Sequence, residues 1–428
     1  MSSKSIAYID SYTWLGSRLG LDRMRELMDR TGNPQERIKF VHLAGTNGKG
    51  STACFLASVL QSAGYKTGLY TSPYIHTFHE RMQINGVSIS DAALDEAVDQ
   101  VRRHADMMPD HPTTFELTTA AAFAWFAQEQ CDIVVLETGM GGSLDATNVI
   151  SAPEVSVITP IDLDHMEHLG PTVGEIAKSK AGIIKPGRPV VTARQRPEAM
   201  AVLAETAARL GCDLTEVDLT ALIPGPFSFH GQQFSFGALS DLSIRLLGRY
   251  QMENAALALT AAEVLEKLGW SIPIPARREG VASARWPGRF ELIGQAPAVI
   301  VDGGHNAQGA RALAESLIRY FPGKKIVFVM GILADKELNA ILSPILPLAE
   351  QVYTIMPDNS RAMTAEALAE QITAQGVPAQ PVGNAAAALG MAKQIAGVNG
   401  VVCYFGSLYS VAAARDALLE STSPLKGE

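Results

Sequence analysis

The sequence contains no apolar run that could cross a membrane. A membrane-spanning helix needs about 18 or more consecutive apolar residues, and no such stretch occurs among the 428 residues. Residues 1–10 also lack a basic region followed by an apolar run, which is the pattern of a secretory signal peptide. We therefore expect a cytoplasmic protein with no membrane partner.

The sequence is also poor in cysteine and in clustered basic charge. The four cysteines show no Cys-x-x-Cys spacing and stand in apolar runs, at Cys54, Cys131, Cys212 and Cys403. This scatter indicates reduced core thiols, not a zinc site or a disulfide framework. Acidic residues (44) outnumber lysine and arginine (35), which gives a formal net charge of −9. Because nucleic-acid binding needs a basic stripe, we expect no nucleic-acid partner.

What the sequence does contain is an alternation of short apolar runs with helical patterns. A chain of 428 residues exceeds one ordinary core, so we expect two domains. The runs are rich in Val and Ile, as in strands buried on both faces of a parallel sheet. They are Lys39–Ala44, Thr67–Tyr70, Ile133–Glu137, Val155–Thr159 and Pro189–Thr192. Helical patterns include Leu21–Thr31, Asp91–Ala105, Thr118–Gln130 and Arg196–Leu210. This alternation predicts a doubly wound α/β domain with ligands at the carboxyl ends of its strands.

A change of pattern marks a second domain. Phe227–Leu247 has short alternating runs that predict a hairpin or meander, and Gln251–Leu268 is an alanine-rich helical pattern. Pro and Gly then interrupt both periodicities near Ala284–Arg289. Strand and helix patterns alternate again from Ala298 to Leu419, which predicts a smaller Rossmann-like α/β domain. We expect domains at residues 1–288 and 289–428.

The most specific motif is the glycine-rich turn Gly45–Ser51, which follows an apolar run and precedes a helix expected at Ala53–Ala63. Glycines let backbone N–H groups face phosphates, and the helix N-terminus adds a positive dipole end. Lys49 can neutralise the outer phosphates, and a hydroxyl of the following Ser-Thr pair can reach them or their magnesium ion. One extra glycine separates the lysine from that pair, unlike in the standard P-loop. The motif predicts triphosphate binding.

Polar residues follow several other predicted strands. Glu137 closes a buried run beside a glycine turn, where a carboxylate can hold a magnesium ion bound to phosphates. Asp162, Asp164 and His165 follow the next run, and Ser72 follows Thr67–Tyr70. The structural alternatives are a loop-bracing carboxylate for Glu137 and a packed histidine for His165. Their common place at strand ends favours a site.

Two further segments have less specific patterns. Lys178, Lys180 and Lys185 surround the C-terminal end of a predicted helix, where cations interact favourably with the helix dipole. On the residues alone this placement favours a structural role. The segment Tyr74–Gly86 is rich in aromatic, His and Arg residues and resembles a mobile loop over a site more than a packed element.

In the second domain, Asp302 ends a strand and precedes two glycines and His305. A carboxylate at such a strand end commonly binds ribose hydroxyls or other polar ligand groups. Asp302 and Arg289 are therefore candidates to close over a nucleotide held by the first domain. A salt bridge between the domains is the alternative.

Together these motifs resemble the folylpolyglutamate synthase and dihydrofolate synthase family, within the Mur ligase group of ATP-dependent amide-bond-forming enzymes. The resemblance covers nearly the whole chain, and the order and spacing of the motifs match. They are Gly45–Ser51, Tyr70–Pro73, Glu137–Gly142, Leu144–Asn148, Asp164–His165, Lys180–Ile183, Trp286–Arg289, Asp302–Asn306 and Gly406–Tyr409. The resemblance implies a P-loop N-terminal domain of the Mur ligase type and a smaller α/β C-terminal domain.

The resemblance further implies a site for ATP and two Mg²⁺ ions. The nucleotide would be bound by Asn47, Gly48, Lys49, Gly50, Ser51, Asn254, Arg289 and Asp302. Ser72 and Glu137 would hold one magnesium ion and His165 the second. Lys180 matches a lysine that is carbamylated in the family, and the carbamate helps to bind magnesium. Lys180 thereby gains a catalytic role beside Lys49 and His165.

The substrates implied by the resemblance are dihydropteroate, reduced folates and L-glutamate. Folates would lie under the loop Thr71–Arg81, and glutamate near His305 and Ser407 in the second domain. The residues implied to contact folate or pterin are Leu19, Gly20, Leu21, Asp22, Pro73, Tyr74, Arg81, Phe115, Glu116 and Leu144. Leu19–Asp22 and Phe115–Glu116 match the pterin motifs of bifunctional members. The sequence departs from many members at Ser143, where they have arginine.

The implied reaction begins with conversion of a carboxylate to an acyl phosphate by ATP. The α-amine of glutamate then attacks, with His305 as a candidate base, while domain closure excludes water. Three alternatives remain open at this point: a monofunctional folylpolyglutamate synthase, a Mur-type ligase of cell-wall peptide, and a nucleotide-dependent switch without catalysis. The family resemblance favours a monomer.

Overall fold

The computed structural model describes residues 4–359 and 361–422. The chain forms two compact units whose sequence ranges interleave around residues 226–251. The first unit extends to Gly225 and also includes Gln233–Ile244 and Met252–Ala284. The second unit comprises Pro226–Gln232, Arg245–Gln251 and the chain from Arg285 onward. The expected division of binding roles between residues 1–288 and 289–428 stays a prediction.

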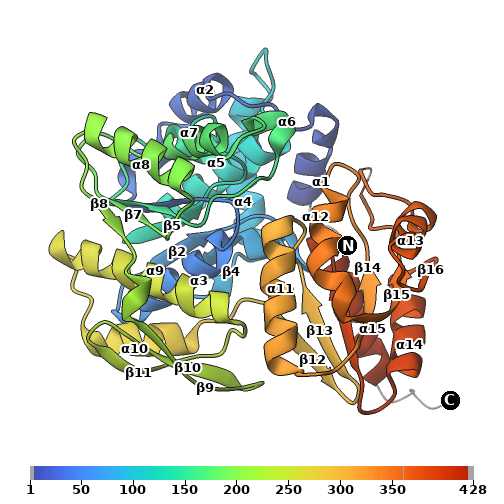
Figure 1. Ribbon diagram of the computed structural model, residues 1–428. Helices are drawn as coiled ribbons and strands as arrows, with labels where there is room; N and C mark the ends of the chain where they lie inside the picture. The colour runs from blue at the N-terminus through green and yellow to red at the C-terminus, as the bar shows by residue number, and fades with distance from the viewer. Residues whose placement is uncertain (1–3, 360, 423–428) are drawn as a thin grey trace. The chain divides into compact units, whose positions relative to one another are not determined.

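The first unit is built on an eight-stranded sheet of order β4-β3-β2-β5-β1-β6-β7-β8 (Figure 1). The strands are β1 Phe40–Ala44, β2 Thr67–Tyr70, β3 Met82–Ile84, β4 Val87–Ser88, β5 Ile133–Glu137, β6 Val155–Ile158, β7 Val190–Thr192 and β8 Leu214–Glu216. Strands β2, β5, β1, β6, β7 and β8 are parallel, and β3 and β4 pair antiparallel at one edge. The central strands β1 and β5 are buried along their whole length, as their continuous apolar runs predict.

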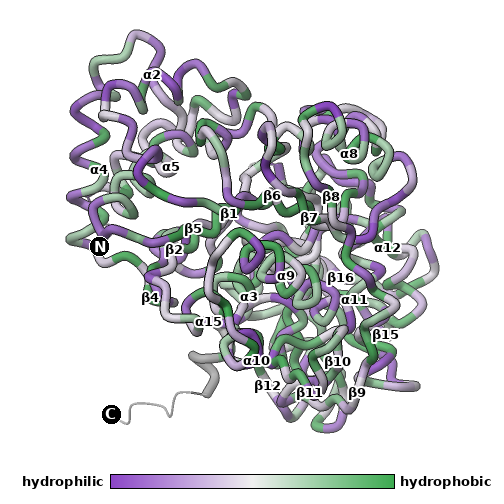
Figure 2. Tube along the Cα trace, turned by 90° about the vertical axis from the view of Figure 1, so that its left-hand side faces the viewer, coloured by the Kyte–Doolittle hydropathy of each residue, from purple (hydrophilic) through white to green (hydrophobic). Residues whose placement is uncertain are grey.

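Helices cover both faces of this sheet, so the predicted doubly wound architecture is confirmed. The helices are α1 Lys4–Asp10, α2 Asp22–Arg30, α3 Lys49–Ser62, α4 Asp91–Ala105, α5 Thr114–Gln128, α6 Met166–Leu169, α7 Val173–Ala181, α8 Pro197–Arg209, α9 Arg249–Lys267 and α10 Ile274–Ser283. Helices α4 and α5 lie on one face, and α3, α9 and α10 on the other (Figure 1). Hydrophilic residues are frequent along the outer helices α2 and α4 (Figure 2). No helix of the described residues is long and apolar enough to cross a membrane.

A three-stranded sheet of order β11-β10-β9 follows, as the alternating runs predict. Its strands are β9 Leu222–Ser228, β10 Gly231–Phe236 and β11 Leu239–Ile244. All four cysteines are free thiols, and three of them are buried.

The second unit contains a six-stranded sheet of order β12-β13-β17-β14-β15-β16. Only β12 is antiparallel to its neighbour among these strands. The strands are β12 Glu291–Gln295, β13 Ala298–Asp302, β14 Ile326–Met330, β15 Ala349–Thr354, β16 Ala379–Pro381 and β17 Val401–Phe405. The helices are α11 Ala307–Tyr320, α12 Leu338–Ile345, α13 Ala365–Thr373, α14 Ala385–Ala396 and α15 Leu408–Thr422. The smaller α/β domain is thus confirmed.

The interpretation of Tyr74–Gly86 as a mobile loop is wrong for most of the segment. A 3₁₀ helix, η3, spans Phe78–Arg81 and leads into β3, which pairs with β2. Phe78 and Met82 are buried. The Glu80 carboxylate also accepts hydrogen bonds from the backbone N–H groups of Ile75, His76 and Thr77, which fixes the turn.

Two helices begin earlier than predicted. Helix α3 starts at Lys49, directly after Gly48, because the glycine in a left-handed conformation turns the chain into the helix. Helix α5 starts at Thr114, where the Thr113 hydroxyl and the Glu116 carboxylate form a capping box. The apolar periodicity alone placed these starts up to four residues too late.

Candidate functional site

The glycine-rich turn lies at the carboxyl end of β1, as predicted. Gly48 has φ +87°, and a Cβ atom there would lie 2.6 Å from the Oδ1 atom of Asn254. Gly45 has φ +153°, and a Cβ atom there would meet the Thr159 hydroxyl at 1.8 Å. Both positions therefore require glycine, and the absence of side chains leaves backbone N–H groups accessible to an anion. The structure also brings the predicted nucleotide residue Asn254 of α9 against this turn.

Lys49 opens α3 and folds back over the turn. Its Nζ atom donates hydrogen bonds to the carbonyl oxygens of Gly45, at 3.1 Å, and Thr46, at 3.2 Å. Because Lys49 lies at the N-terminus of α3, its positive charge adds to the positive end of the helix dipole. Both features favour an anion at this place.

Lys180 reaches the same turn from α7. Its Nζ atom donates a 2.7 Å hydrogen bond to the carbonyl oxygen of Gly45, and the side chain is buried. Burial first, and the neighbouring Lys49 charge second, lower the pKa of Lys180 to about 7, while Asp164 and Asp145 oppose the shift. A large share of Lys180 is therefore a neutral amine at neutral pH, which the helix-dipole interpretation did not predict.

The carboxylates at the strand ends differ in their surroundings. Glu137 is buried at the end of β5 and accepts a 3.3 Å hydrogen bond from the backbone N–H of Ser72. The Asp164 carboxylate accepts from the backbone N–H of His165, whose ring lies 4.0 Å from the same group. Asp162 instead pairs with Arg196 at 2.9 Å, which gives it a structural partner. Ser72 and Glu137 thus lie together, as predicted.

The donors around the turn suit a magnesium-bound phosphate. Three threonine hydroxyls there are buried and have no hydrogen-bond partner in the described part of the chain: Thr52, Thr138 and Thr159. The described residues contain no group of three or more His, Cys, Asp or Glu side chains arranged for a metal ion. Carboxylate, hydroxyl and phosphate oxygens are nonetheless the ligands that Mg²⁺ prefers, and it usually keeps several waters. The residues present therefore fit a magnesium nucleotide better than an all-protein metal site.

The motif Leu144–Asn148 contributes to the family resemblance, but its structural function was not predicted from the sequence. The Asp145 carboxylate accepts hydrogen bonds from the backbone N–H of Met140 and from the Thr147 hydroxyl, at 2.9 and 2.6 Å. The Asn148 amide donates to the carbonyl oxygens of Ser143 and Gly182, both at 3.1 Å. These side chains tie the glycine turn after β5 to the end of α7, and so fix Glu137 relative to Lys180. The only signal of this function in the sequence was the group of short polar side chains Asp145, Thr147 and Asn148.

A buried histidine completes this network. The Nε2 atom of His42, on β1, lies 2.8 Å from the Thr147 hydroxyl. That hydroxyl gives its proton to Asp145, so His42 is the donor and carries its proton on Nε2. Burial first, and the charge of Lys185 second, lower the pKa of His42 to about 3. His42 is therefore neutral at physiological pH.

The residues implied to bind pterin come partly together. The backbone N–H of Gly20 donates to the carbonyl oxygen of Leu144 at 3.4 Å. The Phe115 ring lies so close to Gly139 that a Cβ atom there would be 2.6 Å from it. Leu21 is buried, whereas Leu19 and Leu144 are exposed apolar side chains. The structure thus brings three separate segments of the predicted set together.

The acidic members of this set behave differently from each other. The Asp22 side chain is fully exposed and lies 3.6 Å from Arg25, so its carboxylate does not join the cluster. Glu116 is buried and pairs with Arg23 at 3.1 Å, and its Oε1 atom has no hydrogen-bond partner among the described residues. Arg23 is a residue that sequence reasoning missed. The binding role of Asp22 stays a prediction.

The segment after β2 contributes an aromatic and cationic surface. The guanidinium of Arg81 lies 5.1 Å from the ring centroid of Tyr74 and 5.5 Å from that of Phe78. Its Nε atom is buried without a hydrogen-bond partner in the described chain. Pro73 precedes Tyr74 and follows Ser72 by a cis peptide bond. A guanidinium held by two aromatic rings favours a planar anionic ligand.

In the second unit, the predicted residues gather at the end of β13. The buried Asp302 carboxylate accepts hydrogen bonds from the backbone N–H groups of Phe290 and Gly304, at 2.8 and 2.7 Å. Burial raises the pKa of Asp302, and the Arg289 guanidinium opposes that rise. A Cβ atom on Gly303, the residue after Asp302, would lie 2.6 Å from Arg289, so the predicted residues Asp302 and Arg289 are neighbours. Tyr250 is a further partner of Asp302, at 3.4 Å.

His305 and Ser407 belong to the same edge of this sheet. The Nδ1 atom of His305 lies 3.1 Å from the carbonyl oxygen of Gly303. Ser407 is buried and follows β17, whose Phe405 is in register with Asp302 of β13. The carboxyl ends of these parallel strands therefore carry the predicted polar residues of the second unit.

A phosphate-binding turn on a doubly wound sheet, followed by a smaller α/β unit, defines a nucleotide-dependent ligase of the Mur type. The family model of the Mur ligase middle domain matches residues 43–262, and that of the Mur ligase glutamate ligase domain matches residues 288–408. The chain belongs to the folylpolyglutamate synthase and dihydrofolate synthase family within the Mur ligases.

Named relatives and solved structures agree with this assignment. The dihydrofolate synthase/folylpolyglutamate synthase of Bacillus subtilis is 39% identical, over 96% of this chain and 99% of its own. Mycobacterium tuberculosis folylpolyglutamate synthase complexed with ADP and AMPPCP has a TM-score of 0.88 and 32% identity, over 96% of this chain and 98% of its own. E. coli FolC in complex with DHPP and ADP has a TM-score of 0.88 and 30% identity, over 99% of both chains.

Proposed function

We propose that this chain is a bifunctional dihydrofolate synthase/folylpolyglutamate synthase. It uses ATP to join L-glutamate to dihydropteroate and to the γ-carboxylate of a reduced folate. The observation that carries the proposal is the meeting of Lys49 and Lys180 on one carbonyl oxygen, that of Gly45, at the phosphate-binding turn. The printed names of full-length relatives, which include both activities, support the choice of substrates.

The reaction requires that a carboxylate, a poor electrophile, be activated. ATP transfers its γ-phosphoryl group to the carboxylate oxygen and leaves as ADP, which gives an acyl phosphate. The neutral α-amine of glutamate attacks the acyl carbon, the amine loses a proton, and inorganic phosphate departs from the tetrahedral intermediate. We assign the phosphates to Asn47, Gly48, Lys49, Gly50 and Ser51, and the rest of the nucleotide to Asn254, Arg289 and Asp302.

Lys49 supplies the positive charge that the phosphoryl group needs as its negative charge redistributes. We assign Ser72, Glu137, His165 and a carbamylated Lys180 to two Mg²⁺ ions, which when bound would neutralise the triphosphate. The lowered pKa of Lys180, about 7, supports its carbamylation, because only a neutral amine reacts with carbon dioxide. The base for the glutamate amine is assigned to His305.

Pterin binding is assigned to Leu19–Asp22, Phe115, Glu116 and Leu144, and the folate body to Pro73, Tyr74 and Arg81. The buried Oε1 atom of Glu116, without a partner among the described residues, supports this assignment. A pterin ring presents N–H groups that can donate hydrogen bonds to a carboxylate. Ser407 is assigned to the incoming glutamate.

A coupled assay of ADP release tests the proposal. The full chain is incubated with ATP and glutamate plus dihydropteroate, or plus tetrahydrofolate, and in a third reaction with a muramyl peptide and its amino acid. We expect ADP release with the first two acceptors. Turnover with tetrahydrofolate alone would define a monofunctional folylpolyglutamate synthase, and turnover with the muramyl substrate alone would contradict the folate assignment.

A matched pair of variants tests the pterin assignment. Glu116→Gln keeps the size of the side chain but replaces the carboxylate by an amide, and we expect the KM for dihydropteroate to rise by about tenfold or more. The KM for ATP should stay unchanged. Glu129→Gln alters a carboxylate after the other end of α5 and is the control. The expectations of a monomer and of a cytoplasmic location stay predictions. Analytical ultracentrifugation can check the first and cell fractionation the second.

A further inference from the structure

The two segments assigned to the pterin, Leu19–Asp22 and Phe115–Glu116, are joined by one side chain, that of Arg23 in the first turn of α2. Its Nε atom donates a 3.1 Å hydrogen bond to Oε2 of Glu116, and its Nη2 atom donates a 2.8 Å hydrogen bond to the carbonyl oxygen of Arg18. Its Nη1 atom lies 3.5 Å from the Asp110 carboxylate. One planar guanidinium therefore holds both the backbone that leads into the first segment and the carboxylate of the second.

Asp110 completes the network around Arg23. It accepts two hydrogen bonds from the Arg18 guanidinium, at 2.7 and 3.2 Å, in the paired geometry that these two groups prefer. Arg23 and Glu116 are nearly buried, with 11% and 3% of their side chains exposed, whereas Arg18 and Asp110 lie at the surface. The network thus has a buried inner pair, Arg23 and Glu116, and an exposed outer pair that ties it to the loop between α4 and α5.

The contacts of Glu116 distinguish its two oxygens. Oε2 accepts from Arg23 and, at 2.8 Å, from the backbone N–H of Thr113, so both of its lone pairs are used. Oε1 is buried and has no hydrogen-bond partner among the described residues. Because a buried acceptor without a donor is costly, a ligand N–H that reaches Oε1 restores a hydrogen bond that the protein alone does not form. Arg23 and Thr113 together determine which oxygen is left for the ligand.

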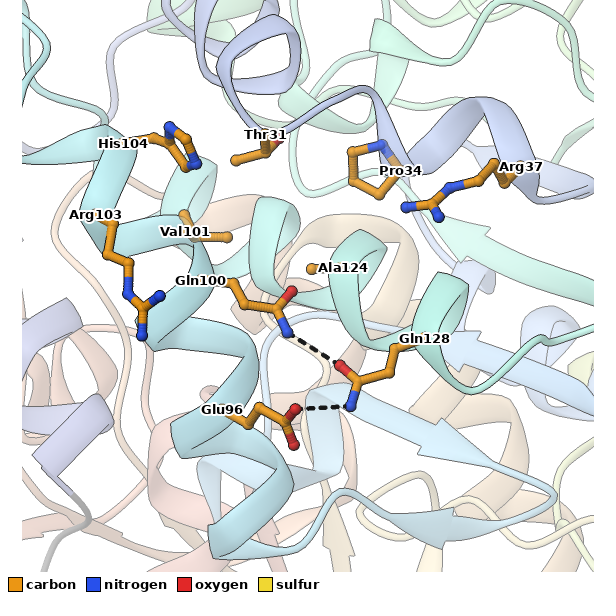
Figure 3. A pocket seen from close by; sticks show the side chains of 10 residues that line it. All are labelled: Thr31, Pro34, Arg37, Glu96, Gln100, Val101, Arg103, His104, Ala124 and Gln128. Atoms are coloured by element: carbon orange, nitrogen blue, oxygen red, sulfur yellow. Dashed lines mark hydrogen bonds between the residues drawn. The ribbon is translucent and has the colours of Figure 1, made fainter.

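Helix α5 is held in place by contacts that do not involve Arg23. At the opposite end of α5, the Gln100 amide donates to Gln128 at 3.1 Å, and the Gln128 amide donates to Glu96 at 3.0 Å (Figure 3). Between its two ends α5 is buried in the apolar core of the first unit over most of its length. A change at Arg23 should therefore alter the orientation of Glu116 without displacing the helix.

We propose that Arg23 is a positioning residue for the pterin ring of the acceptor, which acts through Glu116 and through the backbone of Arg18. This role rests on the proposed function, in which Leu19–Asp22 and Phe115–Glu116 bind the ring. The geometry requires an arginine, because a guanidinium places its donors in one rigid plane and an ammonium is a compact charge without that plane. A lysine would compensate the buried charge of Glu116 but would not hold its carboxylate in one orientation.

Arg23→Lys separates positioning from charge compensation. The variant keeps a positive charge beside Glu116, so we expect it to remain folded, which thermal melting verifies. Its dissociation constant for dihydropteroate, measured by calorimetry on the full chain, should rise by about tenfold. In the ligase assay the KM for dihydropteroate should rise likewise, with little change in kcat, because the ring is bound alike before and during phosphoryl transfer. The KM for ATP should stay unchanged.

Unchanged affinity of Arg23→Lys for dihydropteroate would overturn the positioning role, since charge alone would then be sufficient. If Arg23→Lys does not fold, Asp110→Asn takes its place, because Asp110 is exposed and the inner pair stays intact. We expect the dissociation constant to rise by about threefold in Asp110→Asn. Unchanged affinity in that variant would then overturn the role.

Two matched controls change neighbouring contacts. Arg30→Lys makes the same replacement at the other end of α2, where Arg30 pairs with Glu26 at 2.8 Å. Gln128→Ala removes the polar contacts at the far end of α5. We expect neither variant to change the affinity for dihydropteroate. If Gln128→Ala weakened binding as much as Arg23→Lys, a general loosening of α5 would explain both results and the positioning role would be lost.

A double variant tests the route through Glu116. In the Glu116→Gln background, Arg23→Lys should weaken dihydropteroate binding by a smaller factor than in the wild type, because the two changes affect one contact. Full additivity would overturn the route through Glu116. Wild type that binds dihydropteroate without turnover would contradict the proposed function and keep the comparison of affinities valid. Wild type that does not bind dihydropteroate would overturn both.

Discussion

The Nζ atom of Lys180 donates a 2.7 Å hydrogen bond to the carbonyl oxygen of Gly45, the first residue of the phosphate-binding turn. This contact joins the end of α7 to the end of β1 and leaves the lysine buried next to Lys49. Burial first, and the nearby charge of Lys49 second, lower the pKa of Lys180, so it loses its proton more easily. The chemistry of Lys180 is consequently that of an amine near neutral pH.

We predict that Lys180 becomes carbamylated in the presence of bicarbonate, with a midpoint near its pKa of about 7. The signal of ¹³C-labelled carbamate in an NMR spectrum should grow between pH 6 and pH 8, because the neutral amine is the reactive form. Lys178→Ala, which removes an exposed lysine of the same helix, should keep the signal. A signal that survives in Lys180→Met would assign the carbamate elsewhere.

The same pKa shift predicts how stability depends on pH. The folded pKa of Lys180, about 7, lies below the ordinary value of 10.5, so between these values the unfolded chain binds more protons than the folded one. The free energy of unfolding therefore gains a contribution that rises with pH through this window, about 1.4 kcal/mol per pKa unit at most. Urea denaturation in carbon-dioxide-free buffer should show this slope in the wild type and lose it in Lys180→Met.

Lys49→Ala should abolish most of the ligase activity. Loss of the charge at the N-terminus of α3 removes a stabilising contact to the transferred phosphoryl group. We therefore expect kcat to fall by a factor on the order of 10²–10³. The affinity for ADP should fall as well, measured by calorimetry. Lys178→Ala is the control for the loss of one positive charge. Unchanged ligation and ADP affinity in Lys49→Ala would contradict the assigned site.

Gly48→Ala should weaken nucleotide binding beyond its effect on stability. A side chain at φ +87° is strained by about 1–2 kcal/mol, and here its Cβ atom would also displace Asn254. Gly64→Ala is a matched control, because Gly64 has φ +94° and nothing within 4 Å of a Cβ atom. We expect both variants to melt at lower temperature, and only Gly48→Ala to lose affinity for ADP. Equal ADP affinity of the two variants would show that the close approach of Gly48 to Asn254 does not matter for nucleotide binding.

Asn148→Ala should destabilise the first unit by about 1–3 kcal/mol, because the carbonyl oxygens of Ser143 and Gly182 lose their amide donor. The midpoint of urea denaturation should decrease without a change in its slope. Asn339→Ala, which alters an exposed asparagine, is the comparison. If the glycine turn and α7 are held by other contacts, both variants will have the same midpoint.

The sequence predicts the central features because they are local. The run before Gly45 is apolar throughout and becomes β1, and the spacing of glycines and Lys49 specifies a turn followed by a helix. The short edge strands β8, β12 and β16 were missed because they are not continuous apolar runs. An edge strand is only partly buried, so its sequence carries a weak pattern.

Contacts between distant segments could not be predicted in the same way. The helix-dipole interpretation of Lys180 considered only its own helix, whereas its partner Gly45 is 135 residues away. The family resemblance, not the local pattern, gave that lysine a role at the nucleotide. The bonds of Asp145 and Asn148 likewise depend on which elements the sheet order places side by side.

Helix α5 carries the residues assigned to the pterin, Phe115 and Glu116, in its first turn. Thr119 of the same helix lies 2.9 Å from the hydroxyl of Tyr70, which ends β2 two residues before Ser72. If magnesium nucleotide changes the affinity for dihydropteroate, then dihydropteroate must change the affinity for magnesium nucleotide by the same factor, since equilibrium linkage is reciprocal. Titrating either compound in the presence of the other measures that coupling energy twice.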